Sequence, residues 1–218
     1  MEIRKLLIFG AGEAGRELLN SIIKDINKLT VEFNWEVFGF VESNPELIGK
    51  LVCGVKVFSL QEILDLNFKN EFYGCCPMLN AEIRKRVLQD EIIALNFKLP
   101  NLIHPSVVIS STAVLADGII LYPNVVIGDN AHIKEGVIIN YNSIIGHDVI
   151  INTNCFIGPG VILTGRCIIG ENVLLGAGSI CIPGISIGSN SRIAAGIVAT
   201  TNISPNTTLL LRQSIVKI

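Results

Sequence analysis

The sequence has few charged residues, no long apolar run and no basic cluster. Only 17% of its 218 residues are charged and its formal net charge is −2, so a nucleic-acid-binding function is not expected. Half of the residues are hydrophobic, which excludes the disordered class. No stretch approaches the roughly 20 apolar residues of a transmembrane helix, and the short apolar run before Gly10 lacks the layout of a signal peptide. We therefore expect a cytoplasmic protein without a membrane span.

Cysteine patterns of the metal-binding or redox type are also absent. The six cysteines include no C-x-x-C pair, and no His/Cys cluster has the spacing of a zinc site, so we expect no metal. A disulfide framework is not favoured without a secretion signal. We interpret the cysteines as small buried residues. They are Cys53, Cys75, Cys76, Cys155, Cys167 and Cys181.

Charge and glycine divide the chain into two parts. Residues 1–100 contain 12 basic and 14 acidic residues, whereas residues 101–198 contain only 3 basic and 5 acidic ones. Seven glycines precede residue 101 and 13 follow it. We predict a first domain over residues 1–100, a second over residues 101–205 and a C-terminal tail over residues 206–218. The low charge of the second domain indicates that much of its outer surface is buried in an oligomer.

An Ile or Leu recurs every six positions through the second domain, with Cys181 as the one exception. A six-residue period fits neither a helix nor an alternating strand, but it is typical of a solenoid of short strands and tight corners. Three such units close one triangular coil, so we predict a parallel β-helix of about five coils with these residues inside. The residues are Ile103, Ile109, Leu115, Leu121, Ile127, Ile133, Ile139, Ile145, Ile151, Ile157, Leu163, Ile169, Leu175, Cys181, Ile187 and Ile193.

Apolar segments of the first domain alternate between strand and helix patterns. We expect strands at 5–9, 35–41, 55–58 and 71–76, and helices at 14–28, 60–66 and 80–95. This alternation predicts a small parallel sheet covered by helices, a Rossmann-like α/β domain. The inward face of the first helix should carry Leu18, Leu19, Ile22, Ile23 and Ile26.

A glycine-rich loop joins the first predicted strand to the first predicted helix. Gly10, Gly12 and Gly15 form a G-x-G-x-x-G pattern, in which the backbone turns tightly and helix N–H groups can face a phosphate. Glu42 follows the second predicted strand, where an acid can bind a ribose hydroxyl. NAD or a nucleotide-linked sugar fits this pattern, and so does a tight turn without any ligand.

One of the three histidines, His147, is followed by an acid, Asp148. His147 lies two positions after the inward Ile145, which places it at an outward corner of the predicted coil. A carboxylate that holds an imidazole fixes its tautomer, so the pair can serve as a general base. A solvated surface histidine is the alternative that the residues leave open.

Several motifs together resemble one group of enzymes. They are the glycine loop, Gly39-Phe-Val-Glu42-Ser-Asn-Pro45, Leu102-Ile-His-Pro105, the six-residue units and Ile139-Asn-Tyr-Asn-Ser-Ile-Ile-Gly-His147-Asp148. The chain is similar to the sugar O-/N-acetyltransferases of the sialic-acid O-acetyltransferase and bacillosamine-type N-acetyltransferase group. The resemblance implies a left-handed β-helix and a homotrimer with active sites between subunits. It also implies that acetyl-CoA is the donor and a nucleotide-linked sugar the acceptor.

The resemblance also implies roles for individual residues. His147 matches the base that deprotonates the sugar amine or hydroxyl, Asp148 the acid that assists it, and Asn140 a polar residue near the site. Gly165 matches a glycine whose N–H faces the thioester carbonyl. Coenzyme A would contact Ala177 and Ala195. Because the tail differs from that of the group, we expect Arg212, or alternatively Lys217, to bind the 3′-phosphate of coenzyme A instead. The nucleotide would lie against Gly10, Gly12, Glu13, Gly15, Glu42 and Ser43.

The chain departs from this group at several places, two of which lie in the predicted acyl-CoA region. Phe156 stands where a second histidine is common, and Leu211-Arg212-Gln213-Ser214 replaces the usual closing turn beside coenzyme A. Two other readings therefore stay open. One is a non-catalytic subunit that binds a nucleotide-sugar or serves assembly, and the other is an acyltransferase with another acyl donor or a small amino-acid acceptor.

Overall fold

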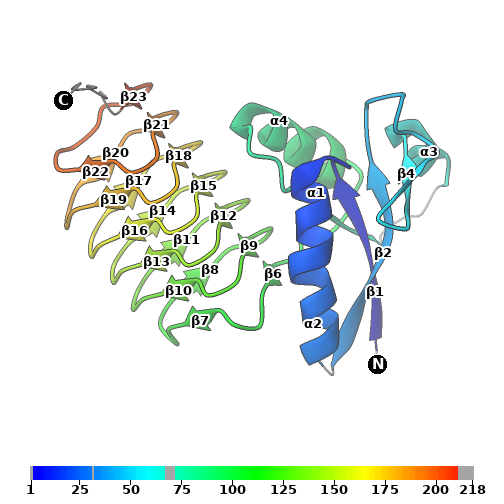
Figure 1. The fold of residues 1–218 in the computed structure, drawn as a ribbon, viewed down its shortest axis with the longest axis horizontal. Coiled ribbons are helices and arrows are strands. Elements are labelled where there is room, and N and C mark those ends of the chain that lie inside the picture. The colour runs from blue at the N-terminus through cyan, green and yellow to red at the C-terminus, as the bar shows by residue number, and fades with distance from the viewer. Residues whose placement is uncertain (1, 31, 67–71, 211–218) are drawn as a thin grey trace, which may run out of the picture. The chain divides into compact units, whose positions relative to one another are not determined.

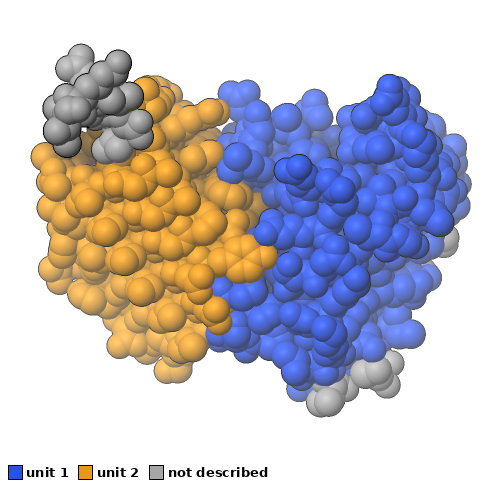
Figure 2. Space-filling view, in the orientation of Figure 1, with its two compact units in different colours: residues 1–107, 116–123 blue, residues 108–115, 124–218 orange. Residues whose placement is uncertain are grey.

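The computed structural model describes residues 2–30, 32–66 and 72–210. The chain forms two compact units, which Figure 2 shows in separate colours. The first comprises residues 1–107 and 116–123, and the second comprises residues 108–115 and the chain from residue 124 onward. In the described part of the chain, no helix is long and apolar enough to cross a membrane.

The first unit contains a five-stranded sheet in the order β3-β4-β2-β1-β5 (Figure 1). Its strands are β1 (Glu2–Phe9), β2 (Phe33–Val41), β3 (Leu51–Val52), β4 (Val55–Phe58) and β5 (Phe72–Cys75). All neighbours are parallel except β3 and β4, which form an antiparallel hairpin. The four predicted strands are confirmed, whereas β3 was missed because two residues carry too little of an apolar pattern. Parallel pairing places the carboxyl ends of β1, β2, β4 and β5 at one edge.

A helix of three consecutive segments follows the glycine loop. They are α1 (Glu13–Leu18), the π-helical η1 (Leu19–Ile23) and α2 (Lys24–Leu29). The Asn27 side chain ties α2 to β2, because it exchanges hydrogen bonds with the backbone N–H and C=O of Trp35 at 2.7 and 2.8 Å. The predicted apolar face is confirmed. Its five residues are each at most 5% exposed: Leu18, Leu19, Ile22, Ile23 and Ile26.

Two further helices cover this sheet, and each begins at a side-chain cap. The helix α3 (Leu60–Asp65) starts at a capping box, in which Ser59 Oγ accepts from the Glu62 N–H and the Glu62 carboxylate accepts from the Ser59 N–H. The helix α4 (Ala81–Arg86) continues into the π-helical η2 (Val87–Ile93). Asn80 caps α4 by accepting from two backbone N–H groups of its first turn. Both helices were predicted from the apolar spacing.

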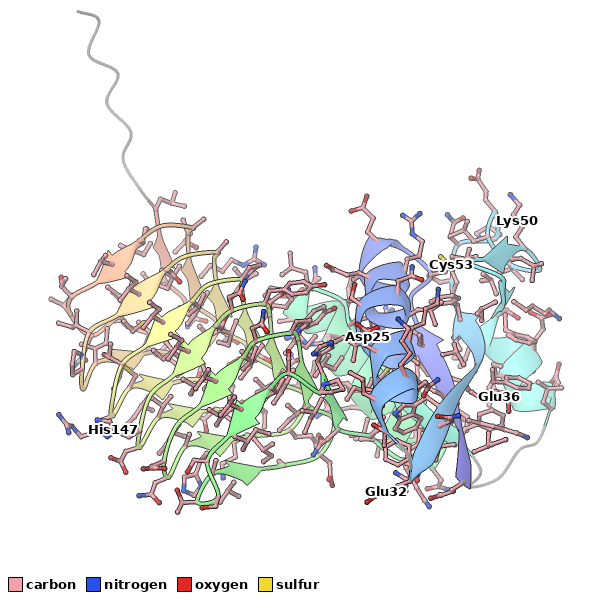
Figure 3. The ribbon with its side chains drawn as sticks, turned by 60° about the horizontal axis from the view of Figure 1, so that its bottom comes forward. Asp25, Glu32, Glu36, Lys50, Cys53 and His147 are labelled. Carbon is pink, nitrogen blue, oxygen red and sulfur yellow. The ribbon has the colours of Figure 1, made fainter. Side chains whose placement is uncertain are left out.

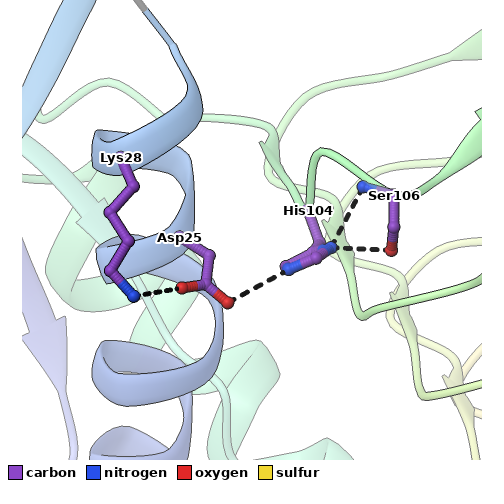
Figure 4. Close-up of polar contacts among 4 residues, drawn as sticks. All are labelled: Asp25, Lys28, His104 and Ser106. Atoms are coloured by element: carbon purple, nitrogen blue, oxygen red, sulfur yellow. Dashed lines mark hydrogen bonds and ion pairs between the residues drawn. The ribbon is translucent and has the colours of Figure 1, made fainter.

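The start of the repeats is held inside the first unit, where β6 (Leu102–Ile103) pairs in parallel with β9 (Ile120–Leu121). His104 follows β6 and is almost buried, with 11% of its side chain exposed. Its Nδ1 accepts from the Ser106 N–H at 3.1 Å, so Nε2 carries the proton and donates to Asp25 Oδ2 of α2 at 3.4 Å (Figure 4). Asp25 also pairs with Lys28 at 2.9 Å. His104 thus has a structural role.

Two-residue strands stack into three parallel sheets in the second unit (Figure 1). Sheet I contains β7 (Val108–Ile109), β10 (Val126–Ile127), β13 (Ile144–Ile145), β16 (Ile162–Leu163), β19 (Ile180–Cys181) and β22 (Val198–Ala199). Sheet II contains β8 (Val114–Leu115), β11 (His132–Ile133), β14 (Ile150–Ile151), β17 (Ile168–Ile169) and β20 (Ser186–Ile187). Sheet III contains β12 (Ile138–Ile139), β15 (Phe156–Ile157), β18 (Leu174–Leu175), β21 (Arg192–Ile193) and β23 (Thr208–Leu209).

The residues that recur every six positions fill the interior of these coils. From Leu121 to Ile193, every residue of the predicted register is at most 1% exposed. One coil takes 18 residues, as the pairing of Val126 with Ile144 shows, which is three units of six. The last coil is shorter, because Arg192 pairs with Thr208 only 16 residues later. The predicted parallel β-helix is confirmed.

Most corners of the coil contain one residue with a left-handed backbone, and the sequence supplies mostly Asn or Gly there. Asn adopts this conformation more readily than other residues with a side chain, and Gly adopts it without steric penalty. The Asn and Gly corners have φ between 52° and 77°: Asn124, Asn130, Asn142, Asn154, Asn172, Asn190, Asn206, Gly118, Gly136, Gly160, Gly178, Gly184 and Gly196. Two corners differ, with Asp148 at φ 56° and Arg166 at φ 63°.

Stacked asparagines stabilise one corner of the coil. Asn154 Nδ2 donates to Asn172 Oδ1 at 2.8 Å, and Asn172 donates in the same way to Asn190 at 2.9 Å. Asn190 continues the row to Asn206 at 3.1 Å. Each amide therefore satisfies its neighbour in the next coil, which holds the coils in register.

Candidate active site

His147 lies at the corner that joins β13 of sheet I to β14 of sheet II. Figure 3 shows its side chain at the outer border of the coils. Its Nδ1 is 2.8 Å from Asp148 Oδ2, and 55% of the imidazole side chain is exposed. The left-handed backbone of Asp148 turns the carboxylate back toward its neighbour. The pair that the sequence predicted is therefore formed, and a substrate can reach it.

The carboxylate of Asp148 is set up to orient the imidazole. The hydrogen bond to His147 holds the pKa of Asp148 below its ordinary value of 3.8, and Asn130 and Arg166 act in the same direction. An ionised Asp148 accepts the Nδ1–H, which leaves a lone pair on Nε2. A neutral imidazole with its lone pair on Nε2 can take a proton from an acceptor amine or hydroxyl.

The Nε2 atom lies directly over Gly165, which occupies the same corner one coil further along. A Cβ built at Gly165 would lie 2.3 Å from His147 Nε2, so glycine is required for the imidazole to keep this position. Among the described residues, no acceptor takes a hydrogen bond from the Gly165 N–H. The structure therefore brings together His147, Asp148 and an unpaired backbone N–H at Gly165.

Arg166 follows Gly165 and was not among the residues predicted for the site. It is exposed, and it occupies the left-handed corner position one coil beyond Asp148. A bulky side chain is uncommon in this conformation, and backbone strain of this kind gathers at functional sites. The signal in the sequence was an arginine at a corner position that Asn or Gly fills in most other units.

The other residues predicted for the second domain lie at a different corner. Asn140, Ala177 and Ala195 follow strands of sheet III, at the corner between sheets III and I. Asn140 is 9% exposed, and its Oδ1 accepts from the Tyr141 N–H at 2.8 Å. Within one chain these residues are separated from His147 by the width of sheet I. Arg212, and its alternative Lys217, lie outside the described residues.

The glycine loop of the first unit is built around two of its three glycines. Gly10 has φ +108°, and a Cβ at Gly15 would lie 2.0 Å from the Gly10 carbonyl oxygen. A Cβ at Gly12 would meet nothing within 4 Å, and Glu13 is exposed in the first turn of α1. Gly10 and Gly15 thus let α1 pack closely on the loop, whereas Gly12 leaves open space beside it.

Glu42 holds this loop against the end of β2. Its carboxylate accepts from the N–H groups of Ala11, Ser43 and Asn44 at 3.0, 2.8 and 3.2 Å. Burial raises the pKa of Glu42, but these hydrogen bonds outweigh it, so the pKa lies below its ordinary value of 4.5. Glu42 therefore organises the loop. Each of its oxygens has two lone pairs, and Oε2, with one bond described here, can still accept from a ligand hydroxyl.

A cavity of about 460 Å³ lies at the carboxyl ends of β1, β2 and β4, which is the usual place for a ligand in an open α/β sheet. It is lined by Phe9, Gly10, Val41, Glu42, Ser43, Ile48, Ser59, Leu60, Met78, Ile83, Arg86, Val87 and Glu91. The predicted Gly10, Glu42 and Ser43 are among them. The charged residues from α4 and η2, Arg86 and Glu91, had no signal in the sequence, because only the folded packing of these helices brings them to the sheet edge.

The described part of the chain contains neither a metal-binding cluster nor a cysteine suited to nucleophilic catalysis. No group of three or more His, Cys, Asp or Glu residues gathers there in a way that could hold a metal ion. None of the six cysteines, all of which lie in the described residues, forms a disulfide; five are buried as predicted, whereas Cys53 is exposed. Burial raises the pKa of Cys76 to about 11 and that of Cys181 to about 12, so these thiols are poor nucleophiles.

Two family models match consecutive segments of the coils. Residues 130–165 match the model described as bacterial transferase hexapeptide, six repeats, and residues 166–201 match the hexapeptide repeat of succinyl-transferase. Together the two models cover residues 130–201, so this segment is similar to the hexapeptide repeats of transferases. Among curated protein sequences, none matches the chain.

Solved structures of similar fold extend over nearly the whole chain. The acetyltransferase domain of PglB from Neisseria gonorrhoeae, in complex with acetyl coenzyme A, is 26% identical with a TM-score of 0.77, over 94% of this chain and 95% of that one. Perosamine N-acetyltransferase from Caulobacter crescentus, in complex with CoA and GDP-perosamine, is 24% identical with a TM-score of 0.79, over 94% and 92%. WeeI from Acinetobacter baumannii is 18% identical with a TM-score of 0.79, over 94% and 95%. The predicted fold class, an α/β domain followed by a left-handed β-helix, is confirmed.

Proposed function

We propose that this transferase is an acetyl-CoA-dependent acetyltransferase whose acceptor is the amine or hydroxyl of a nucleotide-linked sugar. The observation that carries the proposal is the His147–Asp148 pair with Nε2 directly over Gly165. The similarity to the acetyl-CoA complex of the PglB domain supports acetyl-CoA as donor. Perosamine N-acetyltransferase is described in complex with GDP-perosamine, a nucleotide-linked amino sugar. An amino sugar is therefore the favoured acceptor.

Direct transfer accounts for the geometry. His147 Nε2 takes a proton from the acceptor, whose nitrogen or oxygen attacks the thioester carbonyl. The Gly165 N–H donates to the oxyanion that forms, and the tetrahedral intermediate collapses with release of the thiol of coenzyme A. Asp148 keeps the Nδ1–H in place and stabilises the imidazolium. The proton then leaves His147 for the departing thiolate.

A homotrimer would complete this site. The outward residues of sheet I form an aliphatic row with no polar member: Val108, Val126, Ile144, Ile162, Ile180 and Val198. Four of the six are between 37% and 61% exposed in the single chain, which indicates a surface that another copy covers. The row borders both corners that carry predicted site residues. A neighbouring copy on this row can therefore bring its own Ala177 and Ala195 to the His147 corner. We place the reaction in the cytoplasm, where acetyl-CoA is available.

Replacing His147 by Ala tests the function. We expect turnover, measured as release of free coenzyme A thiol, to fall about 10²- to 10⁴-fold, because general-base catalysis is worth that much. Acetyl-CoA affinity, measured by calorimetry, should stay unchanged. His132→Ala is the matched control, since His132 lies on the outer face of sheet II and should leave turnover intact.

Two outcomes would contradict the proposal. A His147→Ala variant with near-full turnover would show that His147 is not the general base. A folded wild-type protein that binds no acetyl-CoA would instead favour the non-catalytic binding subunit, to which Phe156 on the outer face of β15 also points.

A further inference from the structure

The cavity of the first unit contains an acid that has no hydrogen-bond donor among the described residues. Glu91 lies on η2 and lines the cavity, and only 21% of its side chain is exposed. Its nearest cation is Arg86, whose Nε is 4.0 Å from Glu91 Oε1. Burial raises the pKa of Glu91, and Arg86 only partly opposes this. A half-buried carboxyl without donors is unfavourable unless a ligand supplies them.

The second acid of the cavity is different, because Glu42 already receives three backbone N–H groups and its pKa is lowered. Glu91 is therefore the acid that lacks donors. The rest of the lining is largely apolar, with Phe9, Val41, Ile48, Leu60, Met78, Ile83 and Val87. A flat ring with N–H groups on one edge would fit this cavity, because the ring can pack against the apolar side chains and the N–H groups can donate to Glu91.

We infer that Glu91 and Arg86 recognise the base of the acceptor nucleotide and that this base is guanine. The inference rests on the proposed function and names the substrate class of the same enzyme. A carboxylate accepts two parallel hydrogen bonds, and guanine alone among the five common bases offers two adjacent N–H donors on its edge, at N1 and N2. The neighbouring O6 is an acceptor that Arg86 can reach from beside Glu91.

The other bases match this pair less well. Uracil and thymine have a single N–H between two carbonyl oxygens, which would repel the second carboxylate oxygen. Adenine and cytosine offer one amino group beside a ring nitrogen acceptor. A GDP-linked sugar therefore satisfies both oxygens of Glu91, whereas a UDP-, dTDP- or CDP-linked sugar leaves one of them without a donor.

A role in binding and a role in folding predict opposite effects of Glu91→Gln on stability. The pKa of Glu91 is higher in the folded state than in the unfolded state, so folding disfavours the ionised carboxylate. This loss of stability is present in full above the folded-state pKa and absent below the unfolded-state pKa. Glutamine removes the penalty at neutral pH. We expect the variant to have a higher Tm and a lower affinity for GDP, whereas a glutamate kept for structure would lose Tm on substitution.

The test uses calorimetry on the full chain with GDP, IDP, UDP, CDP and dTDP as probes. Wild type should bind GDP about 10- to 100-fold more tightly than IDP, which lacks the N2 amine, and than the three pyrimidine nucleotides. In Glu91→Gln the preference of GDP over IDP should disappear. Asp90→Asn is the matched control, because it makes the same charge change at the adjacent exposed residue, outside the cavity lining, and should bind like wild type.

The outcomes separate this inference from the proposed function. Equal or tighter binding of any pyrimidine nucleotide, or of IDP, by wild type overturns guanine recognition and leaves the acetyltransferase proposal standing. Unchanged GDP affinity in Glu91→Gln would show that Glu91 does not bind the base. Failure of every nucleotide to bind, with acetyl-CoA still bound, overturns the inference together with the nucleotide-linked acceptor. The wild-type comparison of GDP with IDP needs no variant, so it decides the matter even where Glu91→Gln does not fold.

Discussion

At the scale of single residues, the site depends on which side chains stand at the left-handed corners. Asn or Gly fills this position in most of the other corners, whereas Asp148 and Arg166 fill it beside His147 and Gly165. Asp is tolerated there and also supplies a carboxylate to the imidazole, so its choice has a chemical reason. Arg has no such tolerance, and a non-glycine residue in this region costs about 1 kcal/mol or more. Strain therefore coincides with the corner that carries the His–Asp pair.

Gly165→Ala should separate the position of the imidazole from the stability of the fold. The new Cβ would lie 2.3 Å from His147 Nε2, and the exposed ring can swing away at little cost to folding. We expect turnover to fall about 10-fold or more because the base is displaced, with a change in the free energy of unfolding within about 1 kcal/mol. Steady-state kinetics and thermal unfolding measure the two quantities.

The double variant gives the control for this substitution. Once His147 is Ala, the alanine at position 165 has no imidazole to displace, so adding Gly165→Ala should change turnover very little. Fully additive losses in the two single variants would show that Gly165 acts independently of the position of His147.

At the scale of elements, the repeat was predictable because one residue type decides each position. An inward Ile or Leu every six residues and an Asn or Gly at most corners fix the strand and the turn locally. The helix from Glu13 to Leu29 was predictable for the same reason, since the apolar residues that recur at helical spacing in the sequence are the residues that are buried. The cavity was not, because Arg86 and Glu91 reach the sheet edge only through the packing of α4 and η2. The separation of the predicted site residues between two corners is fixed by the 18-residue coil, but it was not part of the prediction.

Glu42→Gln tests the link between the glycine loop and β2. Because the folded-state pKa of Glu42 is lowered, its contribution to stability is present above the unfolded pKa near 4.5 and is lost as the pH falls through the folded value. Glutamine loses the charge-assisted hydrogen bonds at every pH. We expect about 1 kcal/mol of destabilisation at pH 7, a value reduced for the partial exposure of Glu42.

Denaturant unfolding of wild type and Glu42→Gln from pH 7 to pH 3 measures this contribution. The gap between the two proteins should close as the pH falls, because protonated Glu42 no longer stabilises the loop. A gap that stays constant with pH would show that the charge of Glu42 does not contribute.

At the scale of the whole molecule, the three faces of the coil differ in what they show to solvent. The aliphatic row of sheet I is uninterrupted, whereas the outer face of sheet II contains His132 and Ser186, and that of sheet III ends with Arg192 and Thr208. A subunit interface needs a contiguous apolar centre with few charges. Sheet I is therefore the face on which a second copy would lie.

Ile144 and Ile168 provide a matched test of this assignment. Each is the first residue of a two-residue strand, and they are 44% and 45% exposed, but Ile144 belongs to sheet I and Ile168 to sheet II. Ile144→Asp would bury a charge in the interface, so we expect light scattering to report subunits smaller than the wild-type assembly, together with loss of turnover. Ile168→Asp makes the same chemical change on an open face and should leave the assembly intact. If both variants stay assembled, the row on sheet I is not the interface; if both dissociate, the interface is not confined to it.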